Sequence, residues 1–174
     1  KFKRDLPELV VYEAEANPSE LDFLSIITRI KAKNVDAVYN LLLPPQSGAF
    51  GKQIRAAGYK GDIFSAHQVE DWREIEASQG GLLGSWFVSV NPLNDQDFIK
   101  RYQAAFNDMP KAGAGNGYDS AKMIIDGSQE SDLNAYLHNL RDFKGTLGVY
   151  SYNPEGYFEI KSVVKKVTEQ GFEL

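Results

Sequence analysis

Short apolar runs alternate along the chain with stretches in which hydrophobic residues recur at helical spacing. The longest run, Asp36–Leu43, is nearly continuous and predicts a β-strand buried on both faces of a sheet. Pro44 and Pro45 end this run, and a turn at Asn153–Gly156 divides the last β-rich part of the chain. Strands are predicted at Asp36–Leu43, Asp62–Ala66 and Ser85–Val90, with a hairpin or two consecutive strands at Val149–Tyr152 and Tyr157–Val167.

Helices are predicted around and between these strands. Ser19 with Asp22 three places later is typical of a helix start, and a short apolar run, Leu9–Tyr12, precedes it. Two stripes at helical spacing predict buried helix faces: Phe23, Ile27 and Ile30, and then Phe98, Tyr102 and Phe106. The predicted helices are Ser19–Asn34, Ala49–Ala57, Val69–Ala77, Asp97–Asn107, Tyr118–Gln129 and Asp132–Asp142.

Strands that alternate with helices through short loops predict an α/β fold with a parallel sheet. We expect a three-layer, Rossmann-like arrangement in which helices cover both faces of the sheet. The length of 174 residues is that of one ordinary domain, and Met109–Gly115 is the stretch that resembles a linker.

Composition narrows the classes of partner. The net charge is −5 and the basic residues are spread out, which argues against nucleic acid or an anionic membrane surface as the main partner. The basic groups Lys1–Arg4 and Lys165–Lys166 are interpreted as solvated surface. No apolar run approaches the ~20 residues that span a bilayer, and Lys1–Val11 lacks the apolar segment of a signal peptide.

The sequence offers little material for catalysis. Cysteine is absent, and there is no Walker A motif, no GxSxG elbow and no GxGxxG after a strand. Only two histidines occur, so we predict no catalytic residue, no metal site and no cofactor. An acidic cluster at helical spacing predicts a solvated helix face in preference to a metal site; it consists of Glu70, Asp71, Glu74 and Glu76.

The candidate ligand-binding residues lie at the carboxyl ends of two predicted strands, where open α/β sheets bind ligands. Leu43 and Pro44 follow the first strand and offer apolar contact, whereas His67 and Gln68 follow the second and offer hydrogen bonds. The alternative is structural: Leu41–Leu43 would belong to the core, and His67 would merely cap the helix after it.

Several segments, in order, resemble the type I periplasmic substrate-binding proteins of the leucine/isoleucine/valine and amide transporter class. The resemblance covers nearly all of the chain, and it is the order and spacing of the segments that make it specific. The matching segments are Asp22–Tyr39, Gly48, Lys52–Tyr59, Phe98–Phe106, Gly117–Ala121, Phe143–Gly148 and Asn153–Tyr157.

The resemblance implies a two-lobed binding protein that closes around a small organic ligand and delivers it to the membrane permease of an ABC transporter. Such a protein is exported to the periplasm or cell exterior, free or lipid-anchored. This chain would be the second part of it. Residues 1–111 would form the second lobe, residues 112–152 would cross back into the first lobe, and residues 153–174 would make the return crossing and a terminal strand.

The resemblance also implies ligand positions in the cleft between the lobes. Leu43 stands where relatives that bind leucine have an aromatic residue, and His67 stands where they have a carboxylate that pairs with the ligand's ammonium group. An imidazole cannot replace that carboxylate, so a carboxylate or carbonyl near His67 fits better; Glu70 and Asp71 are near enough to supply an ammonium site instead. The predicted ligand-binding residues are Leu43, Pro44, His67, Gln68, Asn116 and Tyr118.

Other functions stay open at this point. A sensory or regulatory domain of the same fold is the main alternative to transport, and an enzyme with a flavodoxin-like core is disfavoured because catalytic groups are missing. The helices Tyr118–Gln129 and Asp132–Asp142 would bury apolar faces against first-lobe strands outside this chain. We therefore expect them to fold onto the remaining lobe or to pack against a second chain, as in a swapped homodimer.

Overall fold

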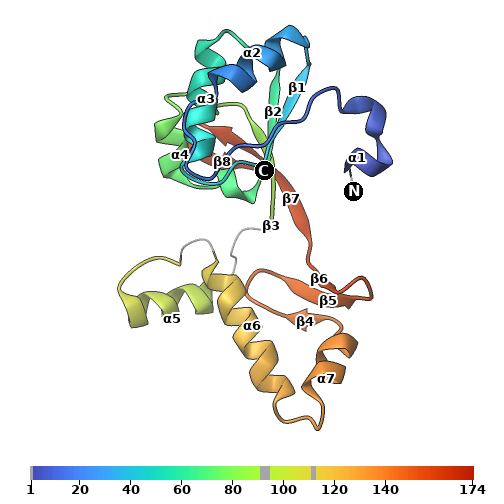
Figure 1. Cartoon of the computed structure of the whole chain (residues 1–174). Coiled ribbons are helices and arrows are strands. Elements are labelled where there is room, and N and C mark those ends of the chain that lie inside the picture. Colours follow the sequence, from blue (N-terminus) through green and yellow to red (C-terminus); the bar gives the residue numbers. More distant parts are fainter. Residues whose placement is uncertain (1, 91–94, 111–112) are drawn as a thin grey trace. The chain divides into compact units, whose positions relative to one another are not determined.

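The computed structural model describes residues 2–90, 95–110 and 113–174, which fold as two compact units (Figure 1). Unit 1 contains residues 1–89 and 164–174, and unit 2 contains residues 90–163. The predicted α/β fold is confirmed. Helix α5 (Gln96–Phe106) falls inside the segment predicted as the second lobe, yet it belongs to unit 2. Part of the predicted linker, residues 111–112, lies outside the described residues.

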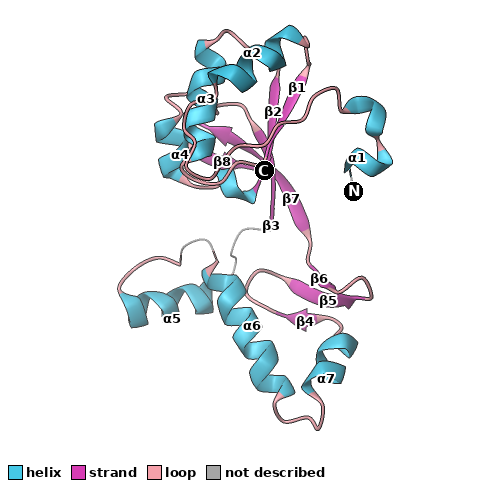
Figure 2. Cartoon of the chain, in the orientation of Figure 1, coloured by secondary structure: helices cyan, strands magenta, loops and turns pink. Residues whose placement is uncertain are grey.

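Unit 1 is built on a sheet with the strand order β1-β2-β3-β7-β8 (Figure 2). The β1–β2 and β2–β3 pairs are parallel, and β7–β8 is antiparallel. Strands β3 and β7 run across the boundary with unit 2. Its elements are α1 (Phe2–Asp5), η1 (Pro7–Leu9), α2 (Leu24–Ala32), β1 (Ala37–Asn40), α3 (Gln46–Ala56), β2 (Asp62–Ala66), η2 (His67–Val69), α4 (Trp72–Ala77), β3 (Trp86–Val90), β7 (Ser162–Thr168) and β8 (Gly171–Glu173).

The core of unit 1 joins α2, α3 and α4 to one face of this sheet. The predicted stripe Phe23, Ile27 and Ile30 is buried, which confirms the helical spacing. Helix α2 nevertheless begins at Leu24 and not at Ser19, because the carboxylate of Asp22 accepts the Leu24 N–H at 3.0 Å. The run Leu9–Tyr12 contains the end of η1 and forms no strand.

The opposite face of the sheet is open over much of β1, β2 and β3. Tyr39, Phe64 and Val88 are exposed, whereas Ile63 and Phe87 beside them are fully buried. The prediction that the first strand is buried on both faces is therefore wrong, because this chain covers only alternate residues of its strands. The strand is also shorter than predicted and ends at Asn40.

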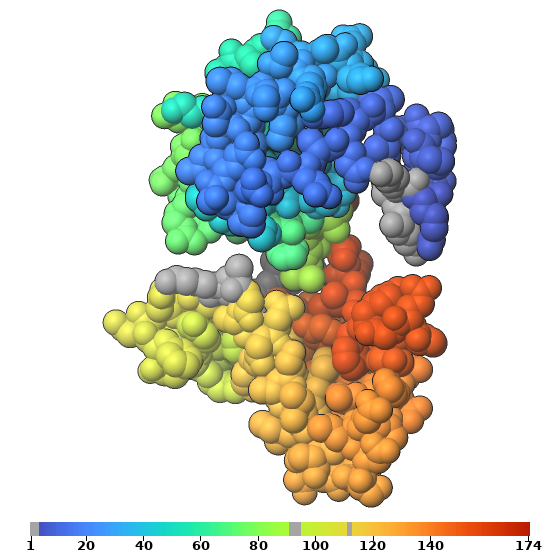
Figure 3. Space-filling view, in the orientation of Figure 1, coloured from blue at the N-terminus to red at the C-terminus, as the bar shows by residue number. Residues whose placement is uncertain are grey.

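The described residues of unit 2 form three helices and a three-stranded antiparallel sheet in the order β4-β5-β6. The predicted hairpin is confirmed at β5–β6, while β7 joins the sheet of unit 1. Figure 3 shows α6 and α7 forming one continuous surface with these strands. The elements are α5, α6 (Ala114–Gly127), α7 (Leu133–Asn139), β4 (Phe143–Lys144), β5 (Val149–Asn153) and β6 (Tyr157–Glu159).

Apolar packing in unit 2 differs in part from the predicted helix faces. Met123 and Leu140 are buried in a cluster that also takes Tyr136 of α7, as amphipathic helices require. Phe98 of the α5 stripe is buried, but Phe106 is 66% exposed, so the prediction that the whole stripe is core is wrong. The expected swapped homodimer stays a prediction.

A buried carboxylate organises unit 2. Asp119 of α6 is 1% exposed and accepts hydrogen bonds from the Thr146 N–H at 2.8 and 2.9 Å and from the Leu147 N–H at 3.3 Å. It also accepts the hydroxyls of Thr146 at 3.1 Å and Tyr150 at 3.0 Å. A Cβ at Gly145 would lie 2.5 Å from this carboxylate, so only glycine fits there. Asp119 thus fixes the β4–β5 turn against α6.

We predict that Asp119→Ala destabilises unit 2 by about 3 kcal/mol, because several buried donors lose their acceptor at once. Urea denaturation of the intact protein and hydrogen exchange of the Thr146 and Leu147 amides measure this loss. Asp126→Ala, on the exposed side of the same helix, is the control and should have little effect. Equal protection factors in the two variants would contradict the assignment.

The Tyr150 hydroxyl makes the stability of unit 2 depend on pH in the alkaline range. Burial, and then the hydrogen bond to Asp119 and its negative charge, raise the pKa of Tyr150 above its ordinary value of 10.0. The unfolded chain ionises this phenol near that ordinary value, so stability is complete below about pH 10 and falls as the pH rises toward the native pKa. The loss is at most about 1.4 kcal/mol per pH unit for one proton. Tyr150→Phe should flatten this dependence in urea unfolding from about pH 10 to 11, where the fall in stability begins; an unchanged slope would contradict it.

Candidate functional site

The carboxyl ends of β1, β2 and β3 meet at one edge of the unit 1 sheet. Asn40 at the end of β1 is in register with Ser65 of β2, and Ala66 is in register with Val88 of β3. Because the three strands are parallel, the segments that follow them start from the same edge. The structure therefore brings the Leu43–Pro44 segment and the His67–Gln68 segment to neighbouring positions, as predicted.

Two hydrogen bonds shape the loop after β1. The side-chain oxygen of Asn40 accepts the Leu42 N–H at 3.0 Å, and the Ser47 hydroxyl donates to the Leu42 carbonyl at 2.7 Å. Leu42 consequently packs against the core, while Leu43 is 58% exposed. Pro44 is exposed beside it. The alternative that Leu41–Leu43 are all core residues is wrong for Leu41 and Leu43.

The segment after β2 turns His67 outward. It forms the short 3₁₀ helix η2, in which Val69 is fully buried and His67 is exposed. Gln68 is partly buried, and its side-chain oxygen has no hydrogen-bond partner among the described residues. The structural alternative for His67 is wrong, because the cap of the next helix α4 is Asp71, whose side chain accepts the Arg73 N–H.

The acidic residues after β2 form the predicted solvated face only in part, since Glu76 is exposed but Glu74 is buried. Glu74 is only 3% exposed, and its carboxylate accepts the Gly48 N–H of α3 at 2.8 Å. A helix N-terminus has unpaired N–H groups that favour a negative charge, so this buried carboxylate joins α4 to α3. Within residues 2–90, 95–110 and 113–174, no group of three or more acidic or histidine side chains is placed to hold a metal ion.

Glu70 connects the loop after β2 to two strands of the sheet. Its carboxylate forms an ion pair with the ammonium group of Lys165 on β7 and accepts the hydroxyl of Ser89 on β3. Lys165 is 5% exposed, so the interpretation of Lys165–Lys166 as solvated surface is wrong for Lys165. Sequence spacing gave no signal for this pair, because its partners are 95 residues apart.

Asp71 is also occupied. Besides the Arg73 N–H at 2.9 Å, its carboxylate accepts Nε of Arg73 at 3.0 Å and Nη2 at 2.6 Å. The hydrogen bond from this guanidinium is the main reason that the pKa of Asp71 lies below its usual range. Asp71 thus stays ionised and stabilises the N-terminus of α4.

The remaining predicted site residues lie in unit 2, near the start of α6. Asn116 is exposed, and Tyr118 is half-buried. The Tyr118 ring packs 4.9 Å from Phe98, and its hydroxyl accepts a 2.8 Å hydrogen bond from Arg101. Their contact with a ligand stays a prediction.

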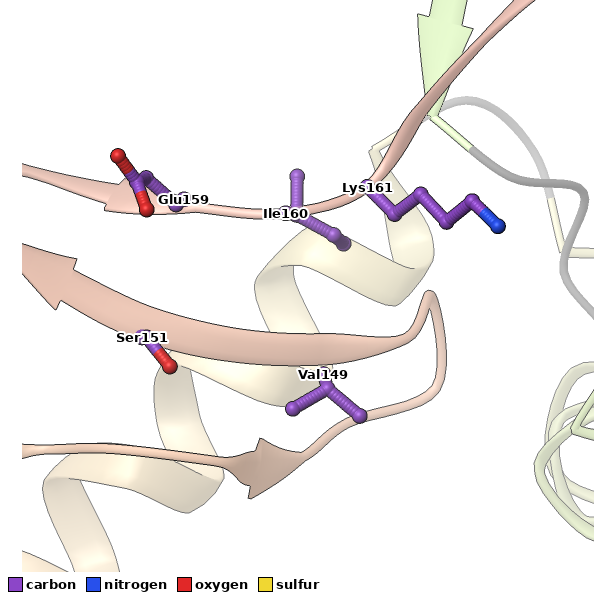
Figure 4. Close-up of a pocket in the computed structure, with 5 residues that line it drawn as sticks. All are labelled: Val149, Ser151, Glu159, Ile160 and Lys161. Carbon is purple, nitrogen blue, oxygen red and sulfur yellow. The ribbon is translucent and has the colours of Figure 1, made fainter.

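A separate hollow lies on β5–β6 and the segment after it, with a volume of about 400 Å³ (Figure 4). It is lined by Val149, Ser151, Glu159, Ile160 and Lys161. None of the predicted site residues lines it, and the Glu159 carboxylate already accepts a hydrogen bond from Asn153.

The chain belongs to the periplasmic binding protein family, whose model matches residues 3–148. This is a family of solute-binding proteins and receptors that are exported from the cytoplasm. No curated protein sequence matches the chain.

Solved structures of the same fold confirm the architecture. A leucine-binding protein from Thermotoga maritima superposes with a TM-score of 0.83 at 22% identity, covering 99% of this chain and 54% of its own. An extracellular ligand-binding receptor from Desulfohalobium retbaense superposes with a TM-score of 0.84 at 22% identity. The alignment covers 99% of this chain and 32% of the receptor. A solute-binding protein of an R. palustris ABC transporter, in complex with benzoate, superposes with a TM-score of 0.77 at 20% identity. The alignment covers 98% of this chain and 51% of that protein. The chain spans about half the length of the first of these.

We predict that Glu70→Gln destabilises unit 1 by about 2–3 kcal/mol, because it leaves the buried Lys165 ammonium without a carboxylate. The loss is below the ~3–5 kcal/mol of a fully buried pair, since 27% of the Glu70 side chain reaches solvent. The double variant Glu70→Gln/Lys165→Met should recover most of it in urea denaturation. Additive losses in the two single variants would show that the residues do not interact.

Proposed function

We propose that this chain is the ligand-binding part of a solute-binding protein that serves an ABC transporter. The ligand is a small organic molecule of the amino acid, amide or organic acid type, bound at the carboxyl edge of the unit 1 sheet. The observation that carries this proposal is the exposure of Leu43 and His67 on adjacent segments of that edge. Each is turned outward because its neighbour, Leu42 or Val69, packs in the core.

The membership of the family supports this proposal in its general form. Relatives of the same fold include a leucine-binding protein and proteins solved in complex with isoleucine and with benzoate, so an amino acid and an organic acid are both represented. Pro44 and Gln68 complete the proposed contacts in unit 1, and Asn116 and Tyr118 are the proposed contacts in unit 2. The protein acts by binding and release, with no catalytic step.

The proposed partner is the membrane permease of the transporter, and the proposed location is the periplasm or cell exterior. The helices in the described part of the chain are all too short or too polar to cross a membrane. A ligand-sensing receptor is the second candidate, which the name of the D. retbaense relative favours. Measuring ligand uptake in cells that lack the gene for this protein distinguishes the transport component from the receptor. Uptake is lost if the protein is a transport component and continues if it is only a receptor.

We predict that Leu43→Asp weakens ligand binding at least tenfold in calorimetry, since an apolar contact becomes a desolvated charge. Ligands are first found by thermal shift of the intact protein against amino acids, amides and organic acids. A bound ligand at about 100 times its Kd adds about 2.7 kcal/mol to the free energy of unfolding. The matched control is Leu24→Asp on α2, where the leucine is 56% exposed against 58% for Leu43.

Equal affinity in the Leu43 and Leu24 variants would remove Leu43 from the site. A screen in which no compound of any type raises the melting temperature would contradict the proposed function itself.

A further inference from the structure

We propose that the ligand bears a carboxylate and an apolar group and lacks an ammonium group. This inference rests on the proposed function and narrows its ligand type. An ammonium group taken from water into a binding site needs a carboxylate or a set of carbonyl oxygens to replace its hydration. The question is therefore which negatively charged groups the carboxyl edge of unit 1 can offer.

The Glu70 carboxylate cannot bind a ligand ammonium group without giving up contacts that stabilise unit 1. Its carboxylate is shared between the Lys165 ammonium and the Ser89 hydroxyl. Lys165 is buried on β7, so a ligand that drew Glu70 away would leave a cation without a partner in the interior. The pair is neutral as a whole and offers an incoming ammonium group no net attraction.

Asp71 is occupied in a different way. Its carboxylate accepts hydrogen bonds from the Arg73 guanidinium and from the Arg73 N–H in the first turn of α4. Both roles depend on the ionised form, and the guanidinium neutralises its charge. The alternative ammonium site at Glu70 and Asp71 is thus disfavoured by the contacts of both residues.

The loop after β1 adds no carboxylate at this edge. Residues 41–45 are Leu-Leu-Leu-Pro-Pro. At the described part of this edge, the exposed side chains that can ionise are therefore the imidazole of His67 and the guanidinium of Arg73, which is paired with Asp71.

An imidazole is a suitable partner for a carboxylate. It offers an N–H donor in its neutral form and a cation with two donors when protonated. The N-terminus of α3 is a poorer place for a ligand anion, because the Glu74 carboxylate already accepts the Gly48 N–H there. A carboxylate at His67 leaves the apolar part of the ligand to contact Leu43.

Matched compounds test the inference with the intact protein. The first set is leucine, 4-methylpentanoate and 3-methylbutylamine, and the second is phenylalanine, 3-phenylpropanoate and 2-phenylethylamine. Within each set the side chain is kept while the ammonium or the carboxylate group is removed. We expect a carboxylate without the ammonium group to bind at least tenfold more tightly than its amino acid in calorimetry.

An amino acid or amine that binds as tightly as the matched carboxylate overturns the inference and leaves the proposed function standing. The same holds if only neutral amides bind. Absence of binding by every compound in these sets and in the wider screen overturns both.

Variants of His67 then test whether the carboxylate of the ligand binds at this residue. His67→Glu should weaken binding of the best carboxylate by about tenfold or more, because like charges meet. His67→Gln keeps a donor and should lose less. His138→Glu makes the same charge change at an exposed histidine on α7 of unit 2 and should leave affinity within twofold. Equal affinities in the two glutamate variants would overturn the role of His67. Loss of binding in the double variant Glu70→Gln/Lys165→Met, in which stability is restored, would assign the ligand to Glu70 instead.

Discussion

The contact of Glu70 with Lys165 and Ser89 is the interaction on which the arrangement of unit 1 most depends. Ser89 is the last residue before the chain passes into unit 2, and Lys165 is the second residue after it returns. One carboxylate thus joins the loop after β2 to both strands by which the chain leaves and re-enters the unit. A buried ammonium group requires a carboxylate close by, so the loop is fixed where that requirement is met. His67 is displayed three residues earlier on the same loop.

Unit 2 uses the same physical device with different partners. The Asp119 carboxylate receives backbone and hydroxyl donors from the β4–β5 turn, where no helix or strand could satisfy them. Glu74 is a further example, since it takes an N–H at the start of α3. Asp119 and Glu74 each replace water at backbone groups that the elements leave unpaired, whereas Glu70 does so for two side chains. Acidic residues that a surface pattern would place in solvent therefore carry much of the internal order.

The sequence predicted those helices and strands that are specified by residues close together in the chain. Helical spacing located α2 through Phe23, Ile27 and Ile30, and apolar runs located the parallel strands whose ends bring Leu43 and His67 together. It failed where the partner is distant: Lys165 was interpreted as surface because Glu70 is 95 residues away. It also failed for both-face burial of the first strand, because a continuous apolar run does not show what covers each face. The ligand contacts of Asn116 and Tyr118 remain predictions, because they depend on how the ligand meets unit 2.

The open face of the unit 1 sheet has a consequence for the chain on its own. Tyr39 and Phe64 are in register with each other, and Phe64 is in register with Trp86, so they form a continuous aromatic row. Strand β1 ends the sheet beside this row, with backbone groups directed away from β2. An apolar row next to a terminal strand is a template for pairing with other chains. We therefore expect the isolated chain to associate as its concentration rises and to stay dispersed in dilute solution.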